Sequence, residues 1–365
     1  MEIVGIAEQS LDKIRWMKLV AAITILIVFI AVCCTDHMAE KELIIGFGQM
    51  PNLVKDNKNN LNIVYGTGDS IMYSFSSDVG RIFSSPELIA VLPKLAASHT
   101  RGPQIAATSE GLIVTASNSP GNIFSYIKDE KDNWRQTQKI NDVDTVAKEG
   151  LMALTADGEN AFAVWLDLRD QHNKIFGAKS SDGGKTWSKN NLIYASPDST
   201  VCECCKPSVV MKENDVYVMF RNWLNGNRDL YLVHSSDGGN TFEQAQKLGN
   251  GNWALNGCPM DGGGITINKN GIPQTVWNRK GMIYACEPGK EEEQLGKGRN
   301  CAIESVNGKN VYAWTENGEV IILKPQGKKE NLGKGSLPII KSINNEHIIC
   351  VWENEKQIHS AIVEL

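Results

Sequence analysis

A short sequence that returns at a regular spacing limits the possible folds more than any other feature. Residues 180–187 read SSDGGKTW, and residues 235–242, 55 positions later, read SSDGGNTF. A degraded copy, SSDVGRIF, lies at residues 76–83, about two such intervals earlier. In a tight turn of this kind the aspartate can accept backbone N–H groups and glycine can adopt positive φ. The repeat therefore indicates several copies of one structural unit.

Short β-strand patterns fill the intervals between these turns. Several strand-like runs end at a recurring position, namely Val164-Trp165, Phe220-Arg221, Val276-Trp277, Ala313-Trp314 and Val351-Trp352. With equivalents at residues 63–65 and 113–114 there are seven units, each divisible into four strands. This predicts an all-β propeller with seven blades. The last unit lacks a fourth strand, which residues 42–47 could supply, so that an N-terminal strand closes the ring and removes the sheet edge.

The repeated turn is the Asp box, S-x-D-x-G-x-T-W. On this motif, residues 45–365 resemble the sialidase-superfamily, Asp-box-repeat propeller lipoproteins that bacteria export. In that superfamily the box is structural, so the resemblance implies structural roles for Asp78, Asp182 and Asp237. Sialidases have six blades, and a six-bladed ring is therefore the alternative to seven.

Arginines gather in loops that a propeller would bring to one end of its central channel. They are Arg101, Arg169, Arg221, Arg228 and Arg279. A guanidinium has planar donors that suit carboxylate, sulfate or phosphate, so these loops predict a site for an acidic ligand. Arg169 and Arg228 each precede an aspartate, and an ion pair within the loop is the alternative role for those two. Trp223 breaks the period of the other tryptophans and is a candidate for stacking on a ligand.

The resemblance to sialidases also implies roles for three of these arginines. Sialidases bind the substrate carboxylate with three arginines, and Arg101, Arg221 and Arg279 stand at similar places. Glu203 stands where the family has a catalytic glutamate before its second arginine.

The catalytic pattern of sialidases is incomplete in this sequence. The loop that should hold the family's aspartate, residues 117–122, contains no acid, and Cys301 stands where the tyrosine nucleophile is expected. Glycoside hydrolysis needs a proton donor and a second group near one carbon. The candidate acids are Glu203, Asp167 and Asp261, and whether the chain is an enzyme stays open.

Four cysteines belong to the same presumed channel mouth: Cys202, Cys204, Cys205 and Cys258. In an exported protein the first expectation is a disulfide, for example between Cys204 or Cys205 and Cys258, which would join neighbouring blades. A site for copper or zinc is the alternative, because thiolates bind both metals, and a nucleophilic cysteine is a third. No other cofactor is expected.

The N-terminal residues 1–41 form a separate targeting segment, before a propeller domain at 42–365. Residues 19–34 carry no charge and follow Arg15 and Lys18. This run is shorter than the roughly 20 residues of a spanning helix and matches a secretory signal. Residues 30–33 (IAVC) resemble a bacterial lipoprotein box with Cys33 as the lipidated residue; an uncleaved membrane anchor is the alternative. Both predict export to the periplasm or cell surface, with membrane attachment.

Charge excludes one class of partner. The net charge is −5, and no long basic run follows the N-terminal segment, so nucleic-acid binding is not expected. The leading hypothesis is an exported, monomeric propeller that binds, or binds and hydrolyses, an anionic glycan or another acidic small molecule. The alternative is a noncatalytic scaffold or a cysteine-based metal-handling module.

Overall fold

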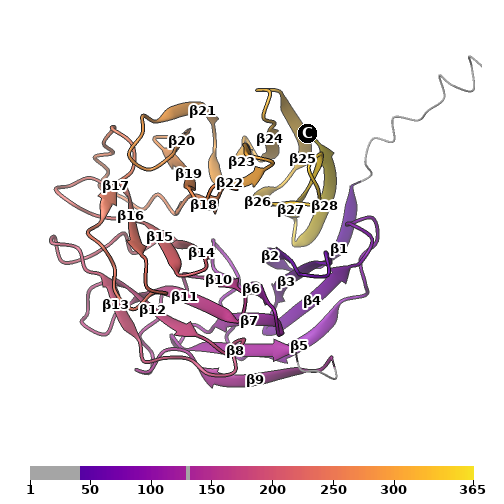
Figure 1. Ribbon diagram of the computed structural model, residues 1–365, viewed down its shortest axis with the longest axis horizontal. Helices are drawn as coiled ribbons and strands as arrows, with labels where there is room; N and C mark the ends of the chain where they lie inside the picture. Colours follow the sequence, from indigo (N-terminus) through magenta and orange to yellow (C-terminus); the bar gives the residue numbers. More distant parts are fainter. Residues whose placement is uncertain (1–41, 129–131) are drawn as a thin grey trace, which may run out of the picture. The chain divides into compact units, whose positions relative to one another are not determined.

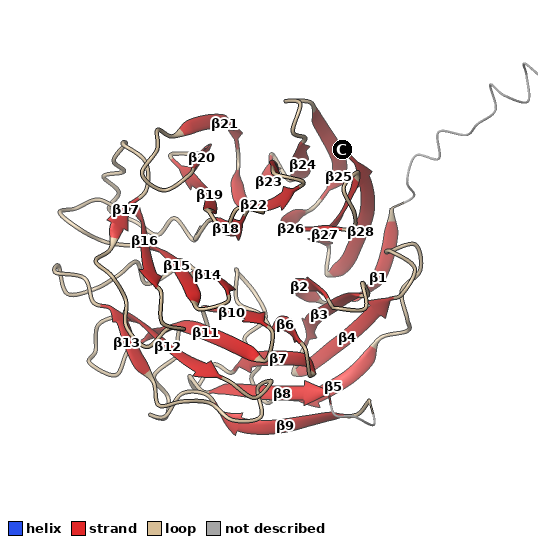
Figure 2. Ribbon diagram, viewed as in Figure 1, coloured by secondary structure: helices blue, strands red, loops and turns tan. Residues whose placement is uncertain are grey.

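A computed structural model describes residues 42–128 and 132–365. These residues form seven four-stranded antiparallel sheets arranged around a common centre (Figure 1). Cys33 and the rest of the expected targeting segment lie outside the described residues. Strands and loops make up the whole ring (Figure 2), and within the described ranges no helix is long and apolar enough to cross a membrane.

The blades are numbered here from the N-terminal side of the ring, innermost strand first. Blades 1 and 2 contain β2(Gln49–Lys55), β3(Leu61–Thr67), β4(Ser70–Ser76), β5(Glu87–Val91), β6(Gln104–Thr108), β7(Gly111–Ser117), β8(Ile123–Lys128) and β9(Trp134–Lys139). Blades 3 and 4 contain β10(Met152–Asp157), β11(Asn160–Asp167), β12(Lys174–Ser180), β13(Asn191–Tyr194), β14(Ser208–Lys212), β15(Asp215–Arg221), β16(Leu230–Ser235) and β17(Gln246–Lys247). Blades 5 and 6 contain β18(Gly264–Ile267), β19(Pro273–Arg279), β20(Met282–Cys286), β21(Glu293–Lys297), β22(Arg299–Val306), β23(Lys309–Glu316), β24(Glu319–Leu323) and β25(Lys329–Lys334). Blade 7 contains β26(Ser336–Ser342), β27(His347–Asn354), β28(Gln357–Glu364) and β1(Leu43–Phe47).

The two ends of the described chain meet in blade 7. Strand β1 pairs antiparallel with β28, from Leu43 opposite Ser360 to Phe47 opposite Gln357. The ring is thereby closed by an N-terminal strand, as the sequence predicts, and the count of seven blades is confirmed. The six-bladed alternative is wrong, because residues 299–365 supply one complete blade and three strands of a second, which β1 completes.

The Asp boxes are turns between the third and fourth strands of blades 1, 3 and 4. In the blade 3 turn, Asp182 Oδ1 accepts the Ser180 hydroxyl at 2.8 Å and the Thr186 N–H at 2.9 Å. Gly184 has φ +81°, and a Cβ atom there would lie 2.8 Å from Ile113 of blade 2. The glycine is therefore required both by the left-handed backbone and by contact with the preceding blade.

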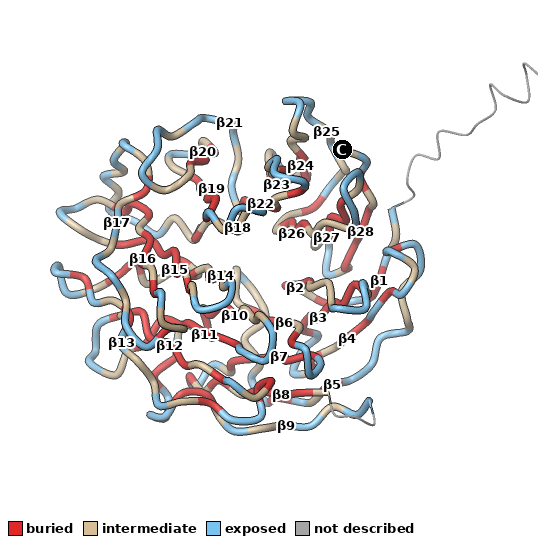
Figure 3. The backbone as a smooth tube through the Cα atoms, viewed as in Figure 1, coloured by how far each residue is buried: buried red, intermediate tan, exposed pale blue. Residues whose placement is uncertain are grey.

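Large side chains on the second strands fill the space between blades. Trp165, Trp277, Trp314 and Trp352 are all essentially inaccessible to solvent. Figure 3 shows the buried segments running through the middle of each blade, with exposed loops at the periphery. The recurring tryptophans are therefore packing residues, and ligand-binding groups have to come from elsewhere in the ring.

Candidate ligand site in the central channel

The innermost strands of the seven blades surround the centre of the ring (Figure 2) and enclose a cavity of about 270 Å³. Every blade contributes to its lining: Met50, Gln104, Leu154, Lys206, Asp261, Asn300 and Leu337 are one residue from each. Polar side chains gather around Lys206 and Asp261, which lie just before the innermost strands β14 and β18. The channel therefore combines an apolar wall with a few polar groups, the usual character of a small-ligand site.

Lys206 places a cation in this cavity without an acidic partner. Its Nζ donates to the neutral Gln104 Oε1 at 2.7 Å. In the described part of the chain, no carboxylate oxygen lies within 4.0 Å of Lys206 Nζ, the distance that defines an ion pair. Burial lowers the pKa of Lys206 to about 8, so the ammonium is still the main form at neutral pH. Lys206 is therefore a half-buried cation of the cavity wall whose side-chain hydrogen-bond partner is neutral.

The loop before β18 fixes the backbone that carries Lys206. A Cβ atom at Gly262 would lie 1.8 Å from the Lys206 carbonyl oxygen, so only glycine permits this approach. The Ser208 hydroxyl donates to the Gly263 carbonyl at 2.9 Å and joins the same two loops. The channel wall at Lys206 is therefore a packed contact between blades 4 and 5.

Asp261 is the acidic group of the cavity. Its Oδ2 accepts the Asn300 N–H at 2.8 Å, and its Oδ1 accepts the Gly263 N–H at 3.3 Å. Burial raises the pKa of Asp261 above its ordinary value, against the attraction of nearby Arg221. A carboxyl group with a raised pKa can remain protonated and donate a proton to a ligand.

Sequence analysis placed Arg101, Arg221 and Arg279 at one channel mouth, but the structure gives each a separate protein partner. Arg101 Nε donates to the Glu149 carbonyl at 2.5 Å. Arg279 forms a two-bond pair with the Glu292 carboxylate and lies 4.0 Å from the centre of the Tyr284 ring. None of the three arginines is among the residues that line the channel cavity. Their roles as ligand-binding groups stay predictions.

Arg221 is the most enclosed of the three arginines, with 1% of its surface exposed. It donates to three backbone carbonyl groups: Asp261 at 3.0 Å, Arg228 at 2.7 Å and Asn278 at 2.9 Å. These carbonyl groups belong to loops and strands of blades 4 and 5. The guanidinium therefore connects the two blades.

Arg228 and its neighbours form a second polar cluster, whose members are not among the residues that line the cavity. The Arg228 guanidinium lies 4.0 Å from the Trp223 ring centre, and its Nη1 is 3.6 Å from Glu203 Oε2. The same Nη1 donates to the Cys202 sulfur at 3.1 Å. The structure thus brings together Arg228, Trp223, Glu203 and Cys202, all in the loops of blade 4.

Asp167 lies apart from these groups. It is fully buried, and its carboxylate accepts the Trp165 indole N–H at 2.8 Å and two N–H groups of the Arg169 guanidinium at 2.9 and 3.0 Å. Arg169 therefore has an ion pair within its loop, but with Asp167 rather than with the following Asp170, which pairs with Lys174 instead. A catalytic role for Asp167 stays a prediction, while its contacts are those of a loop support.

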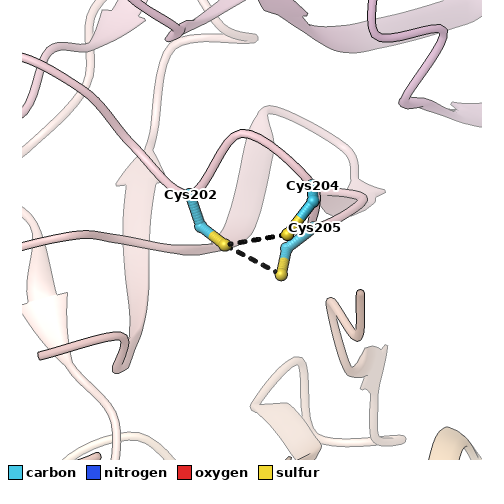
Figure 4. Close-up of side chains that lie close together, drawn as sticks. All are labelled: Cys202, Cys204 and Cys205. Atoms are coloured by element: carbon cyan, nitrogen blue, oxygen red, sulfur yellow. Dashed lines mark hydrogen bonds between the residues drawn. The ribbon is translucent and has the colours of Figure 1, made fainter. Parts of the chain in front are cut away.

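The four cysteines lie together, in two chemical forms. Cys204 and Cys258 form a disulfide between the loops before β14 and β18, and Cys202 and Cys205 are free thiols. Figure 4 shows Cys202, Cys204 and Cys205 with their sulfur atoms turned toward one another. Structural zinc takes four protein ligands, whereas the disulfide leaves only two thiols here. The described geometry thus favours a disulfide with two neighbouring free thiols over a structural zinc site.

Comparison with known proteins places the fold but not the family. No protein-family model matches the sequence, and no curated protein does either. The structure is similar to virginiamycin B lyase from Staphylococcus aureus, with a TM-score of 0.55 and 13% identity over 89% of this chain and 99% of that chain. It is similar to an α-L-arabinanase from Penicillium chrysogenum, with a TM-score of 0.52 and 11% identity over 88% and 97% of the two chains.

NanB sialidase from Streptococcus pneumoniae is a more distant match, with a TM-score of 0.43 and 12% identity over 90% of this chain and 69% of that chain. At these identities the similarity shows the fold alone. The chain is a seven-bladed β-propeller, a fold that it shares with glycosidases and a lyase.

Sequence analysis missed Lys206, Gln104 and Asn300 as channel residues. The signal for Lys206 was its place one residue before Pro207, at the start of an innermost strand. The arginines give a stronger sequence signal for an anion site, but their partners, such as Glu292 and the Asp261 carbonyl group, cannot be identified from the sequence.

Proposed function

We propose that the protein is an exported propeller that binds a small acidic ligand, such as the acidic sugar of a glycan, inside its central channel. The observation that carries the proposal is the Lys206 ammonium, which lies in the cavity with a neutral amide oxygen as its hydrogen-bond acceptor. A ligand carboxylate would supply the missing negative charge. Gln104, Asn300 and backbone groups would provide neutral hydrogen bonds around it.

The dimensions of the cavity set the size of the ligand. Its volume of about 270 Å³ lies just below the roughly 300–1,000 Å³ of cavities that hold drug-sized ligands. One sugar ring or one organic acid fits such a space, whereas an extended oligosaccharide would leave most of its length outside. The site therefore suits a terminal acidic sugar or a free acid.

Catalysis by two carboxyl groups is not part of the proposal. Retaining and inverting glycosidases use a pair of carboxyl groups on either side of the scissile bond. Among the described residues that line the cavity, Asp261 is the one with a carboxyl group, since Glu203 and Asp167 lie elsewhere. Asp261 would instead shape the channel wall, because its two carboxylate oxygens accept the Asn300 and Gly263 N–H groups.

Export through the N-terminal segment completes the proposed function. A lipid on Cys33 would hold the propeller at a membrane surface, where it meets extracellular or periplasmic ligands. Mass spectrometry of the mature N-terminus tests this directly. A lipidated Cys33 as the first residue is expected; a mature chain that begins at Met1 without lipid would contradict it.

Isothermal titration with single acidic sugars tests the channel site. N-acetylneuraminic acid, glucuronic acid and galacturonic acid would be titrated against the protein, with N-acetylglucosamine as the neutral comparison. At least one acid should bind, and Lys206→Gln should weaken it about 10–100-fold, the value of one charge-assisted hydrogen bond. The matched control is Lys189→Gln, because Lys189 is exposed on blade 3. Equal affinities of Lys206→Gln and wild-type protein for these acids would contradict the proposed role of Lys206.

A further inference from the structure

Cys202, Cys204, Cys205 and Cys258 form a connected chain of sulfur atoms. Cys202 Sγ lies 3.0 Å from Cys205 Sγ and 3.8 Å from Cys204 Sγ, and Cys204 is bonded to Cys258 (Figure 4). Cys202 and Cys205 have the Cys-x-x-Cys spacing that is typical of redox-active thiol pairs. A pair of thiols therefore lies next to a disulfide, and this proximity is the first requirement of thiol–disulfide exchange.

Positive charge surrounds the first thiol of the chain. Arg228 Nη1 donates to Cys202 Sγ at 3.1 Å, and the same nitrogen lies 3.6 Å from Glu203 Oε2. The Cys205 thiol donates to Cys202, and this bond, together with Arg228 and Arg221, lowers the pKa of Cys202 to about 7 against the effect of burial. Burial raises the pKa of Cys205 well above its ordinary value. Cys202 is thus the thiol of the pair that ionises near neutral pH, and a thiolate is the attacking form.

The ends of the chain differ in their access to solvent. Cys202 and Cys205 are buried, with 0% and 1% of their surfaces exposed, whereas Cys258 is exposed and Cys204 is half-buried. An outside thiol or disulfide can therefore reach Cys258 first. The buried pair can exchange only through the disulfide in front of it.

We propose that these cysteines form an internal thiol–disulfide relay, in which Cys202 is the nucleophile, Cys204 is the sulfur attacked and Cys205 is the resolving thiol. In the first step the Cys202 thiolate forms a bond to Cys204 Sγ. The Cys204–Cys258 bond breaks, and Cys258 leaves as a thiolate that takes up a proton from solvent.

In the second step Cys205 loses its proton and attacks Cys202 Sγ. The Cys202–Cys205 bond forms, the Cys202–Cys204 bond breaks, and Cys204 leaves as a thiolate that takes up the proton that Cys205 lost. One disulfide and two thiols are present before and after, so no outside oxidant is consumed. The result is that the link between blades 4 and 5 opens and the exposed Cys258 becomes a free thiol.

Electrostatics favour this relay over a divalent metal site. Two buried guanidinium groups, of Arg228 and Arg221, act on Cys202 and stabilise a thiolate. They would repel a Zn²⁺ ion at the same place. The relay also uses the disulfide as observed, whereas a four-sulfur metal site requires its reduction.

Trapping of released Cys258 tests the relay. The purified protein, with no reductant present, would be incubated with excess N-ethylmaleimide, which captures an exposed thiol as it forms. Modification of Cys258 should proceed about tenfold faster at pH 8 than at pH 6, because the thiolate fraction of a group with a pKa of about 7 rises by that factor. Cys202→Ala should abolish the modification, and Cys286→Ala, a control at a buried cysteine on β20, should leave it unchanged.

Peptide mapping of the wild-type protein gives a second test, which does not depend on the folding of a variant. The tryptic peptide of residues 190–212 contains Cys202, Cys204 and Cys205, and it should lose its link to the Cys258 peptide and gain an internal disulfide. The relay is refuted if Cys258 stays linked to Cys204 at pH 8 throughout the incubation. Modification of Cys258 that persists in a folded Cys202→Ala variant would equally refute it. So would purified protein that carries one copper or zinc ion with all four cysteines reduced.

Discussion

Arg221→Gln distinguishes a connecting role for this arginine from the ligand-binding role that the resemblance to sialidases implies. The wild-type side chain is buried and donates to three backbone carbonyl groups at 2.7–3.0 Å. A hydrogen bond from a charged donor contributes about 1.5–3 kcal/mol, so three such bonds set an upper bound of about 9 kcal/mol. Dehydration of the guanidinium offsets part of this, while each buried carbonyl group left without its donor costs about 1–3 kcal/mol, so we expect a net loss of about 3–5 kcal/mol.

A loss of about 3–5 kcal/mol is a large share of the roughly 5–15 kcal/mol that stabilises a typical domain. In a domain of this size it corresponds to a fall in melting temperature of about 4–7 °C. Thermal unfolding followed by tryptophan fluorescence measures it, with Arg135→Gln as the matched control, because Arg135 is exposed on β9. Below the melting temperature, the variant should keep its affinity for an acidic sugar. A connecting role for Arg221 is refuted if the Arg221→Gln variant has the melting temperature of the wild-type protein but no longer binds the acidic sugar.

Three further predictions concern the ring itself. Val79 has φ +61° at the place where the other two boxes have Gly183 and Gly238, so Val79→Gly should raise stability by about 1 kcal/mol; a lower melting temperature would contradict this. Hydrogen bonds from the Thr241 hydroxyl and N–H hold the pKa of Asp237 well below its ordinary value of 3.8. This carboxylate therefore contributes stability above pH 3.8 that is lost as the pH falls further, and Asp237→Asn should flatten the acid side of the melting-temperature profile. Deletion of residues 43–47 exposes the edge of β28 and should produce oligomers in size-exclusion chromatography; a monomer of unchanged melting temperature would argue against closure by β1.

The sequence contains most of the information on the fold because that information is local and repeated. The Asp box is a turn of eight residues, and its hydrogen bonds join Asp182 to Ser180 and Thr186 within the same turn. The recurring tryptophans mark the second strands by their spacing alone. Closure was also predictable, since a last blade with three strands needs a fourth, and Leu43–Phe47 was the one unassigned strand pattern before the first blade.

The site was harder to predict, because charges in a propeller are neutralised by contacts between distant segments. Arg279 pairs with Glu292, which lies 13 residues later in the chain. Arg221 donates to backbone carbonyl groups, and since every residue has one, the sequence does not show which of them accept. A sequence shows that arginines are numerous near the channel but not which of them lack a partner. Lys206 is the reverse case, since a single ordinary lysine becomes notable only when the cavity and its neutral neighbour Gln104 are seen together.

A crystal structure of the protein with a bound acidic sugar tests the central claim most directly. The account predicts the ligand inside the channel, with a carboxylate oxygen within hydrogen-bond distance of Lys206 Nζ and with the Arg279–Glu292 pair intact. A ligand whose carboxylate is held by Arg101 or Arg279, with Lys206 still bonded only to Gln104, would contradict it.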